Sequence, residues 1–184
     1  MSSLQTRRVV TGHSPEGKAI FEADEILLSL NLLTGKPISG SIAGIANIYK
    51  TENWPAALNV PFVDYYNKPL GLTDESGVIC RVIHFPPVKD PAEDKLNILH
   101  RTQSLDFGVV LQGEIQLELD DGEKRSLKRG DVVVQRGTIH DWKNVSDQYC
   151  VMLFVLVPAE LARVPETGKT LEPILPPMPS GESE

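Results

Sequence analysis

The chain has 184 residues, with 25 acidic and 18 basic side chains and a formal net charge of −7. This length supports one domain of ordinary size with an adequate core, and 41% hydrophobic and 23% charged residues are typical of globular rather than disordered chains. The acidic balance excludes the concentrated basic face of a nucleic-acid-binding protein, and no apolar run approaches the roughly 18 residues of a membrane helix.

The N-terminal residues MSSLQTRRVV lack the apolar stretch of a secretory signal. The two cysteines, Cys80 and Cys150, stand alone in apolar segments and are expected to be buried free thiols. We therefore expect a cytoplasmic protein that associates with neither membranes nor nucleic acids.

The first half of the chain predicts a hairpin followed by irregular segments. Two β-prone runs in residues 7–23 flank the turn sequence at residues 14–17. Residues 24–50 are compatible with strand or helix, since short apolar runs are ambiguous. Residues 51–77 are rich in proline and aromatic residues, which predicts a loop packed over a sheet edge or over the mouth of a pocket.

Proline is absent from residues 92–157 but frequent on both sides of them, which marks a hydrogen-bonded core because proline is excluded from central strands. A strand is predicted over Val78–Phe85, and short strands separated by glycine turns follow it. The later strands are predicted at Val109–Leu119, Arg125–Leu127, Val132–Gln135, His140–Asn144 and Tyr149–Val157. This pattern predicts an all-β antiparallel sandwich or barrel.

We divide the chain into an N-terminal hairpin and wrapping segment of the same domain (1–77), a barrel core (78–157) and a C-terminal tail (158–184). The tail opens on a predicted short helix at Ala159–Ala162. It then becomes proline-rich and acidic, which predicts mobility.

Polar side chains occupy one face of a predicted extended segment. His100, Thr102, Ser104 and Asp106 share one parity, so an extended chain points all four to the same side. His140, Trp142 and Asn144 share a parity on another strand. Taken singly, each has an ordinary structural explanation in a turn, in core packing or on the surface. Together they indicate a solvent-exposed face or a polar cavity.

The spacing of these residues matches a known pair of motifs. The chain reads His100-x-Thr102-x3-Asp106-x6-Gly113 and later Gly130-x6-Gly137-x2-His140-x3-Asn144. The two segments resemble the paired motifs of the cupin superfamily. The amino-acid sequence between and around them is similar to that of a subgroup of small single-domain cupins (monocupins). This subgroup is common in fungi and bacteria, and some members are encoded among secondary-metabolism genes.

Four positions depart from the cupin motifs. Asp94 stands at the first glycine, Thr102 at the second histidine, and Asp106 at a glutamate. Gln135 takes the position of the second motif's proline.

The resemblance implies a single jelly-roll β-barrel with a ligand or a metal at its mouth. The metal ligands carried over by the motifs are His100, Asp106 and His140. Two imidazoles and a carboxylate suit Fe, Zn, Mn or Ni, whereas the Thr102 hydroxyl is a poor ligand. A divalent metal is therefore one expectation, and a site without a metal is the other.

Without a metal, the same residues suit acid–base catalysis. Imidazoles with pKa values near ~6.5 transfer protons around neutrality, and Asp106 would orient one of them. Thr102 and Ser104 would orient a substrate oxygen. Arg136 is a candidate for binding a substrate carboxylate, with a salt bridge at the rim as its alternative. The expected apolar lining is Val110, Val132, Val134, Trp142, Met152 and Phe154.

Three functions fit this constellation. The first is a lyase or isomerase that decarboxylates or dehydrates an organic acid or polyketide-like metabolite. The second is a non-haem iron dioxygenase, and the third is a non-enzymatic binding protein for a small metabolite. A small-molecule substrate and a homodimer are the expected partners, the latter joined through the sheet or the N-terminal hairpin.

Overall fold

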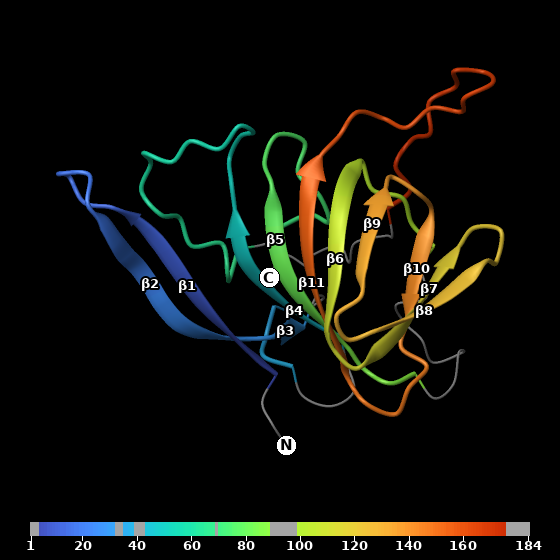
Figure 1. Ribbon diagram of the computed structural model, residues 1–184, viewed down its shortest axis with the longest axis horizontal. Coiled ribbons are helices and arrows are strands. Elements are labelled where there is room, and N and C mark those ends of the chain that lie inside the picture. The colour runs from blue at the N-terminus through green and yellow to red at the C-terminus, as the bar shows by residue number, and fades with distance from the viewer. Residues whose placement is uncertain (1–3, 32–34, 39–42, 69, 89–98, 176–184) are drawn as a thin grey trace, which may run out of the picture.

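The computed structural model describes residues 4–31, 35–38, 43–68, 70–88 and 99–175. Within these ranges the chain forms eleven strands and no helix, in agreement with the all-β prediction (Figure 1). The strands are β1 (Gln5–His13), β2 (Ala19–Leu28), β3 (Leu30–Asn31), β4 (Gly44–Lys50), β5 (Ile79–Phe85), β6 (Ser104–Gln112), β7 (Glu114–Leu119), β8 (Lys124–Lys128), β9 (Val132–Arg136), β10 (His140–Lys143) and β11 (Cys150–Pro158).

The predicted N-terminal hairpin is confirmed as a two-stranded arm that projects from the barrel (Figure 1). Its turn is closed by Ser14, whose backbone pairs with Lys18 and Gly17. The arm is held at its base by Arg8, whose buried guanidinium pairs with Glu25 of β2 and with Asp64 of the 51–77 loop. The ion pair with Asp64 therefore holds the 51–77 loop against the arm.

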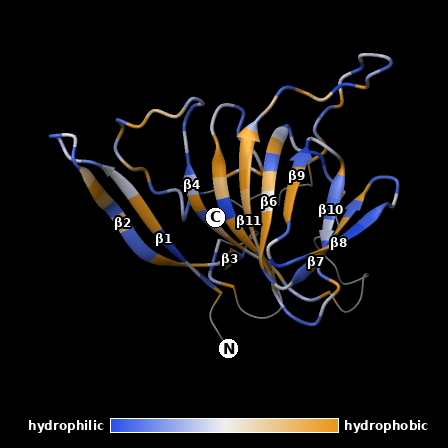
Figure 2. Cartoon of the chain, in the orientation of Figure 1, coloured by the Kyte–Doolittle hydropathy of each residue, from blue (hydrophilic) through white to orange (hydrophobic). Residues whose placement is uncertain are grey.

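The barrel consists of two antiparallel sheets. The larger has the strand order β3-β4-β5-β11-β6-β9, and the smaller has the order β10-β7-β8. Apolar residues concentrate in the central strands of the larger sheet (Figure 2). Strand β11 lies in the middle of that sheet, and its alternate residues are buried. The core between the sheets comprises Ile79, Phe85, Val110, Ile115, Trp142, Cys150, Met152, Phe154 and Leu156.

The strand predicted over Val109–Leu119 is wrong in one respect, because the structure divides it at Gly113. This glycine has φ 74°, a left-handed conformation, and the chain passes there from β6 in the larger sheet to β7 in the smaller one. Periodic apolar character continues across the corner, so the residue pattern did not reveal the break. Gly113 is the corner that lets the two sheets face each other.

Two further expectations need correction. Residues 159–162 form no helix and have no regular secondary structure, and the chain continues to Ile174, which pairs with Arg101. The last residues of the tail, 176–184, lie outside the described residues. Val132 and Val134 are 60% and 54% exposed, so they face away from the interior that they were expected to line.

The two cysteines are free, as expected, but only Cys150 is completely buried, whereas Cys80 is half-buried. Burial raises the pKa of the Cys150 thiol to about 12. Among the described residues, no helix has the length and apolar character needed to cross a membrane.

The corner glycine generates a prediction about stability. A Cβ at Gly113 would stand 2.7 Å from the carbonyl oxygen of Tyr149, a backbone atom that cannot easily move. Gly122 has a similar φ of 83° but open space around it. We expect Gly122→Ala to cost about 1–2 kcal/mol of unfolding free energy from conformation alone, and Gly113→Ala to cost clearly more.

Urea denaturation of the two variants, measured alongside the wild type, tests this expectation. Equal losses of unfolding free energy in the two variants would show that the corner tolerates a side chain.

Candidate active site at the barrel mouth

The residues singled out in the two motifs meet at one end of the barrel. The start of β6 pairs with the end of β9, where Asp106 lies opposite Gln135. His100 and His140 form a backbone bridge with two N–H···O contacts of 3.0 Å, and their rings lie 4.2 Å apart between centroids. The topology thus brings together segments that are far apart in the sequence.

Thr102, Ser104 and Asp106 are on one side of the chain, as their shared parity predicts, and this side is buried, whereas His100 is only half-buried. Thr102, Ser104 and Asp106 are each at most 4% exposed. The Ser104 hydroxyl donates to Thr102 Oγ1 at 3.0 Å, and the Thr102 hydroxyl donates to Asp106 Oδ2 at 3.4 Å. Asp106 Oδ1 is buried and has no hydrogen-bond partner. The carboxylate is therefore anchored through one oxygen and unpaired at the other.

Gln135 connects this carboxylate to His140. Its side-chain Nε2 donates to Asp106 Oδ2 at 3.3 Å and to His140 Nε2 at 2.8 Å. The carbonyl of Thr138 accepts from His140 Nδ1 at 2.9 Å, which makes His140 a neutral imidazole with Nε2 as the acceptor. Both amide hydrogens of Gln135 are thereby used, while its Oε1 is buried without a partner.

Sequence reasoning assigned Gln135 no role in the site. The only sign of a role in the sequence is that Gln135 stands where the second cupin motif has a proline. Proline lacks a side-chain donor, so the substitution introduces the amide that links the two motifs.

Burial shifts the pKa values of the two central groups in opposite directions. Desolvation and then the neighbouring His100 lower the pKa of His140 to about 4. Desolvation raises the pKa of Asp106, against opposing effects of Ser104, Thr102, His100 and Arg81. His140 is thus neutral at pH 7 and is not the near-neutral titrating group that its unperturbed pKa suggested.

Arg81 of β5 is a second interior residue without an assigned role in the sequence analysis. Its side chain is buried and electrostatically coupled to Asp106. The sequence offered little indication of this position, because a single arginine in an apolar strand is normally expected to face outward.

The remaining predicted residues divide between interior and surface. Trp142 is buried and makes edge contacts with His140 and with Phe154, at centroid separations of 6.3 and 5.6 Å. Arg136 is exposed and lines a pocket of about 250 Å³ together with Thr102, Ser104 and the returning tail. Asn144 is fully buried and donates to the carbonyls of Phe85 and Gln148, which is a structural role.

The three candidate metal ligands are not arranged as a ligand set. Among the described residues, no group of three His, Cys, Asp or Glu side chains is placed to hold an ion. The two nitrogens of His140 contact Gln135 and Thr138. In this arrangement the residues do not fit a metal centre, because the amide of Gln135 occupies the imidazole lone pair that an ion requires.

The depressed pKa of His140 predicts a pH dependence of stability. A histidine whose folded pKa of about 4 lies below its unfolded value of 6.5 contributes stability that is present above pH 6.5 and lost as the pH falls toward 4. We expect unfolding free energy measured by urea denaturation to fall from pH 7 to pH 5, with about 2 kcal/mol of the loss due to His140.

Substitution isolates this contribution. His140→Gln should flatten the pH dependence partly, because His84 is also buried with a lowered pKa and acts in the same direction. Asp106 acts oppositely, since its raised pKa favours the folded state at low pH. The control is His13→Gln on the exposed arm. An unchanged slope in His140→Gln would contradict the assignment.

Comparison with known proteins places this chain in a family. The Cupin domain model matches residues 89–156. The cupin-domain-containing oxidoreductase fogC of Aspergillus ruber is 36% identical over 174 residues, which cover 90% of this chain and 77% of the relative. Phomopsin biosynthesis cluster protein C' of Diaporthe leptostromiformis is 34% identical over 159 residues, which cover 83% of this chain and 78% of the relative.

Among solved structures, a Cupin 2 conserved barrel domain protein from Salinispora arenicola superposes with a TM-score of 0.41. The match has 18% sequence identity and covers 65% of this chain and 79% of the other. The family-model match and the extended identity to the fungal relatives establish that this chain belongs to the cupin family.

Proposed function

We propose that this protein is a cupin enzyme that carries out a proton-transfer step on a small organic acid or polyketide-like carbonyl compound inside the barrel, as a lyase or isomerase. An enzymatic role is supported by relatives named cupin-domain-containing oxidoreductases. A substrate from secondary metabolism is supported by the relatives named for phomopsin biosynthesis.

The carboxyl group of Asp106 is the observation that carries the proposal. One of its oxygens is fixed by Thr102 and Gln135, while the other is buried and unpaired. Desolvation raises the pKa of this group, which brings it closer to the operating pH, where general acid–base catalysis is most effective. Oδ1 is thus the atom to accept a proton from a substrate and to return it.

The step balances without an external oxidant. In an isomerisation, Asp106 Oδ1 takes a proton from the carbon next to the substrate carbonyl, and the electron pair of that C–H bond forms an enolate. The same proton then returns from Oδ1 to another atom of the enolate. In a decarboxylation, Asp106 starts protonated: the C–C bond breaks, CO₂ leaves, the electron pair stays on the adjacent carbon, and Oδ1 gives its proton to that carbon and regains one from water.

His140 is a positioning residue in this scheme. Its neutral ring accepts from Gln135 and so orients the amide that anchors Asp106. Trp142 packs against His140 and provides an apolar surface for the body of a substrate.

Substitution of the carboxyl group tests the proposal. We expect Asp106→Asn to fold normally and to reduce turnover about 10²- to 10⁴-fold, since it keeps the side-chain shape but removes the proton acceptor. NMR detection of solvent deuterium incorporation or CO₂ loss, over a panel of β-keto acids and phenolic carbonyl acids, is the measurement. The control is Asp121→Asn in the exposed β7–β8 turn.

Retained activity in Asp106→Asn would overturn this mechanism. Tight binding of a compound with no turnover in the wild type would support the non-enzymatic binding function instead.

Oxidation is the second candidate function, favoured by the names of the relatives, which are cupin-domain-containing oxidoreductases. In that case an ion such as Fe(II) would have to displace Gln135 from His140 Nε2 before His100, Asp106 and His140 could act together. The two candidates therefore differ in their requirement for a metal.

Metal removal separates them. Because Gln135 occupies the lone pair of His140, we expect protein purified without a His-tag or added metal to contain well under one equivalent of any transition metal. Turnover should survive chelation and the exclusion of oxygen. A full equivalent of iron by elemental analysis, lost together with substrate-dependent oxygen uptake on chelation, would establish the oxidative function.

We also propose a cytoplasmic homodimer. The free cysteines support a reducing compartment. Val9, Phe21, Ile26 and Leu28 share the outward face of the arm by strand register, and all are at least 38% exposed. Such a surface is typical of an interface.

Light scattering should give a dimer for the wild type and a monomer for Phe21→Asp. An unchanged mass for this variant would exclude the arm from the interface.

A further inference from the structure

Arg81 is a charged residue in an environment that does not neutralise it. It lies on β5, opposite Phe154 of β11, and is only 3% exposed. Burial lowers the pKa of its guanidinium to about 10, so the group is still a cation at neutral pH. Removing a cation from water is costly unless the surroundings supply an opposite charge and hydrogen-bond acceptors.

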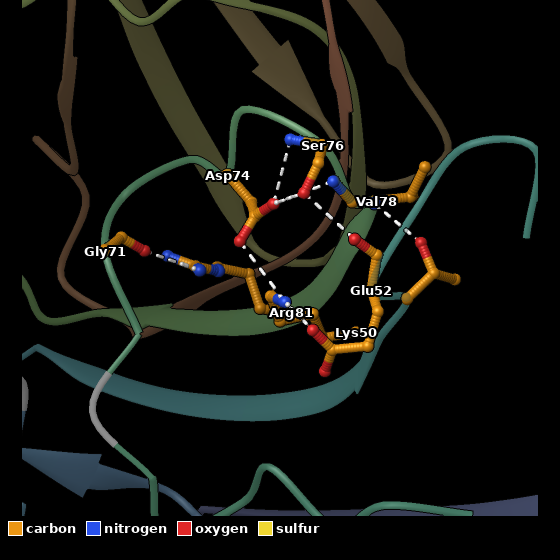
Figure 3. A network of polar contacts seen from close by, with 9 residues as sticks. Lys50, Glu52, Gly71, Asp74, Ser76, Val78 and Arg81 are labelled. Atoms are coloured by element: carbon orange, nitrogen blue, oxygen red, sulfur yellow. Dashed lines mark hydrogen bonds and ion pairs between the residues drawn. The ribbon is translucent and has the colours of Figure 1, made fainter.

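The nearby chain supplies only part of this compensation. Arg81 donates from Nη2 to the carbonyl oxygen of Gly71 at 2.9 Å, while its Nε is buried with no partner. The carboxylate of Asp74 does not pair with Arg81. It accepts hydrogen bonds from the backbone N–H groups of Ser76 and Gly77 and forms an ion pair with Lys50 at 3.2 Å (Figure 3). No ion pair involving Arg81 occurs among the residues that the structure describes.

Asp106 is the carboxyl group that raises the pKa of Arg81 against the effect of burial, and it does so without forming an ion pair. The two residues stand on β5 and β6, which are separated by β11 in the larger sheet. Neighbouring strands are about 4.8 Å apart, so these two backbones lie roughly 10 Å from each other. Their attraction is present, but the carboxylate does not reach the guanidinium.

The unsatisfied atoms of the barrel interior are chemically complementary to one another. Arg81 Nε is a donor without an acceptor, whereas Asp106 Oδ1 and Gln135 Oε1 are acceptors without donors. Unpaired buried polar atoms are rare in folded proteins, because each loses its hydrogen bonds to water without replacement. A ligand that carries an anionic oxygen at one end and a hydroxyl at the other would satisfy both kinds of atom.

We infer that the barrel binds a hydroxy or enolic carboxylic acid whose carboxylate pairs with Arg81 and whose hydroxyl faces Asp106 and Gln135. This inference rests on the proposed function in assuming that the substrate enters the barrel, and it adds the substrate's charge and its polarity. The aromatic side chains of Trp142 and Phe154 suit an aromatic body between the two ends.

Three related probes separate the parts of this inference. Mandelate carries a carboxylate, a hydroxyl and an aromatic ring; mandelamide lacks the charge, and phenylacetate lacks the hydroxyl. The chain has two tryptophans, so Trp54→Phe leaves Trp142 as the only indole that reports binding by fluorescence. We expect mandelate to bind roughly tenfold or more tightly than either analogue, because each analogue lacks one of the two groups that would bond to a charged side chain.

Variants then assign the preference to Arg81. In the Trp54→Phe background, Arg81→Met should abolish the discrimination between mandelate and mandelamide, and Arg81→Lys should retain part of it. Arg81→Met should also melt no lower than its parent, since it removes an uncompensated charge from the interior. Lys50→Met is the matched control: it removes a nearby cation that is already paired with Asp74, and the preference for mandelate should persist.

Equal binding of mandelate and mandelamide by the parent would overturn the inference, as would a preference that survives Arg81→Met. A lower melting temperature for Arg81→Met, in a variant that still prefers mandelate to mandelamide, would assign Arg81 to holding the loop at Gly71 and would also overturn the inference. These measurements need no turnover, so a failure of the proton-transfer mechanism is seen separately, in Asp106→Asn.

Discussion

The side-chain amide of Gln135 is the contact on which the arrangement of the barrel mouth depends. It donates one hydrogen to the carboxylate on β6 and the other to the imidazole on β10. In a water-poor interior, a donor shared between two acceptors fixes both of their orientations, and the backbone carbonyl of Thr138 fixes the tautomer of the ring. The protonation states of Asp106 and His140 follow from this geometry together with their burial.

The same contact explains how this chain departs from the motifs of its family. Thr102 replaces a histidine and donates to Asp106, and Gln135 replaces a proline and donates to the same oxygen. Both changes add hydrogen-bond donors around one carboxylate. They convert positions associated with metal ligation or turn geometry into parts of a hydrogen-bonded polar network.

The sequence was sufficient to predict the hairpin, most strand positions and the shared face of residues 102, 104 and 106, because these follow from turn residues and from the alternation of side chains along a strand. Alternation did not decide whether that face is solvent-exposed or lines the interior. It was not sufficient for Arg81 and Gln135. Whether a polar residue points inward depends on which strand lies beside it, and that pairing is set by the whole barrel. Gly113 shows the same limit, since alternation continues through the corner and only the change of sheet identifies it.

The thiol of Cys150 gives the barrel an internal reporter. It lies in the central strand β11 with no exposed surface, and its pKa of about 12 keeps it protonated at neutral pH. The thiolate is the nucleophile that attacks a thiol reagent, and Cys150 is both buried and protonated in the closed barrel. It therefore reacts only when β11 separates from its neighbours. The rate at which Cys150 is labelled therefore measures how often the barrel opens, at a position within the same closed interior as the candidate site.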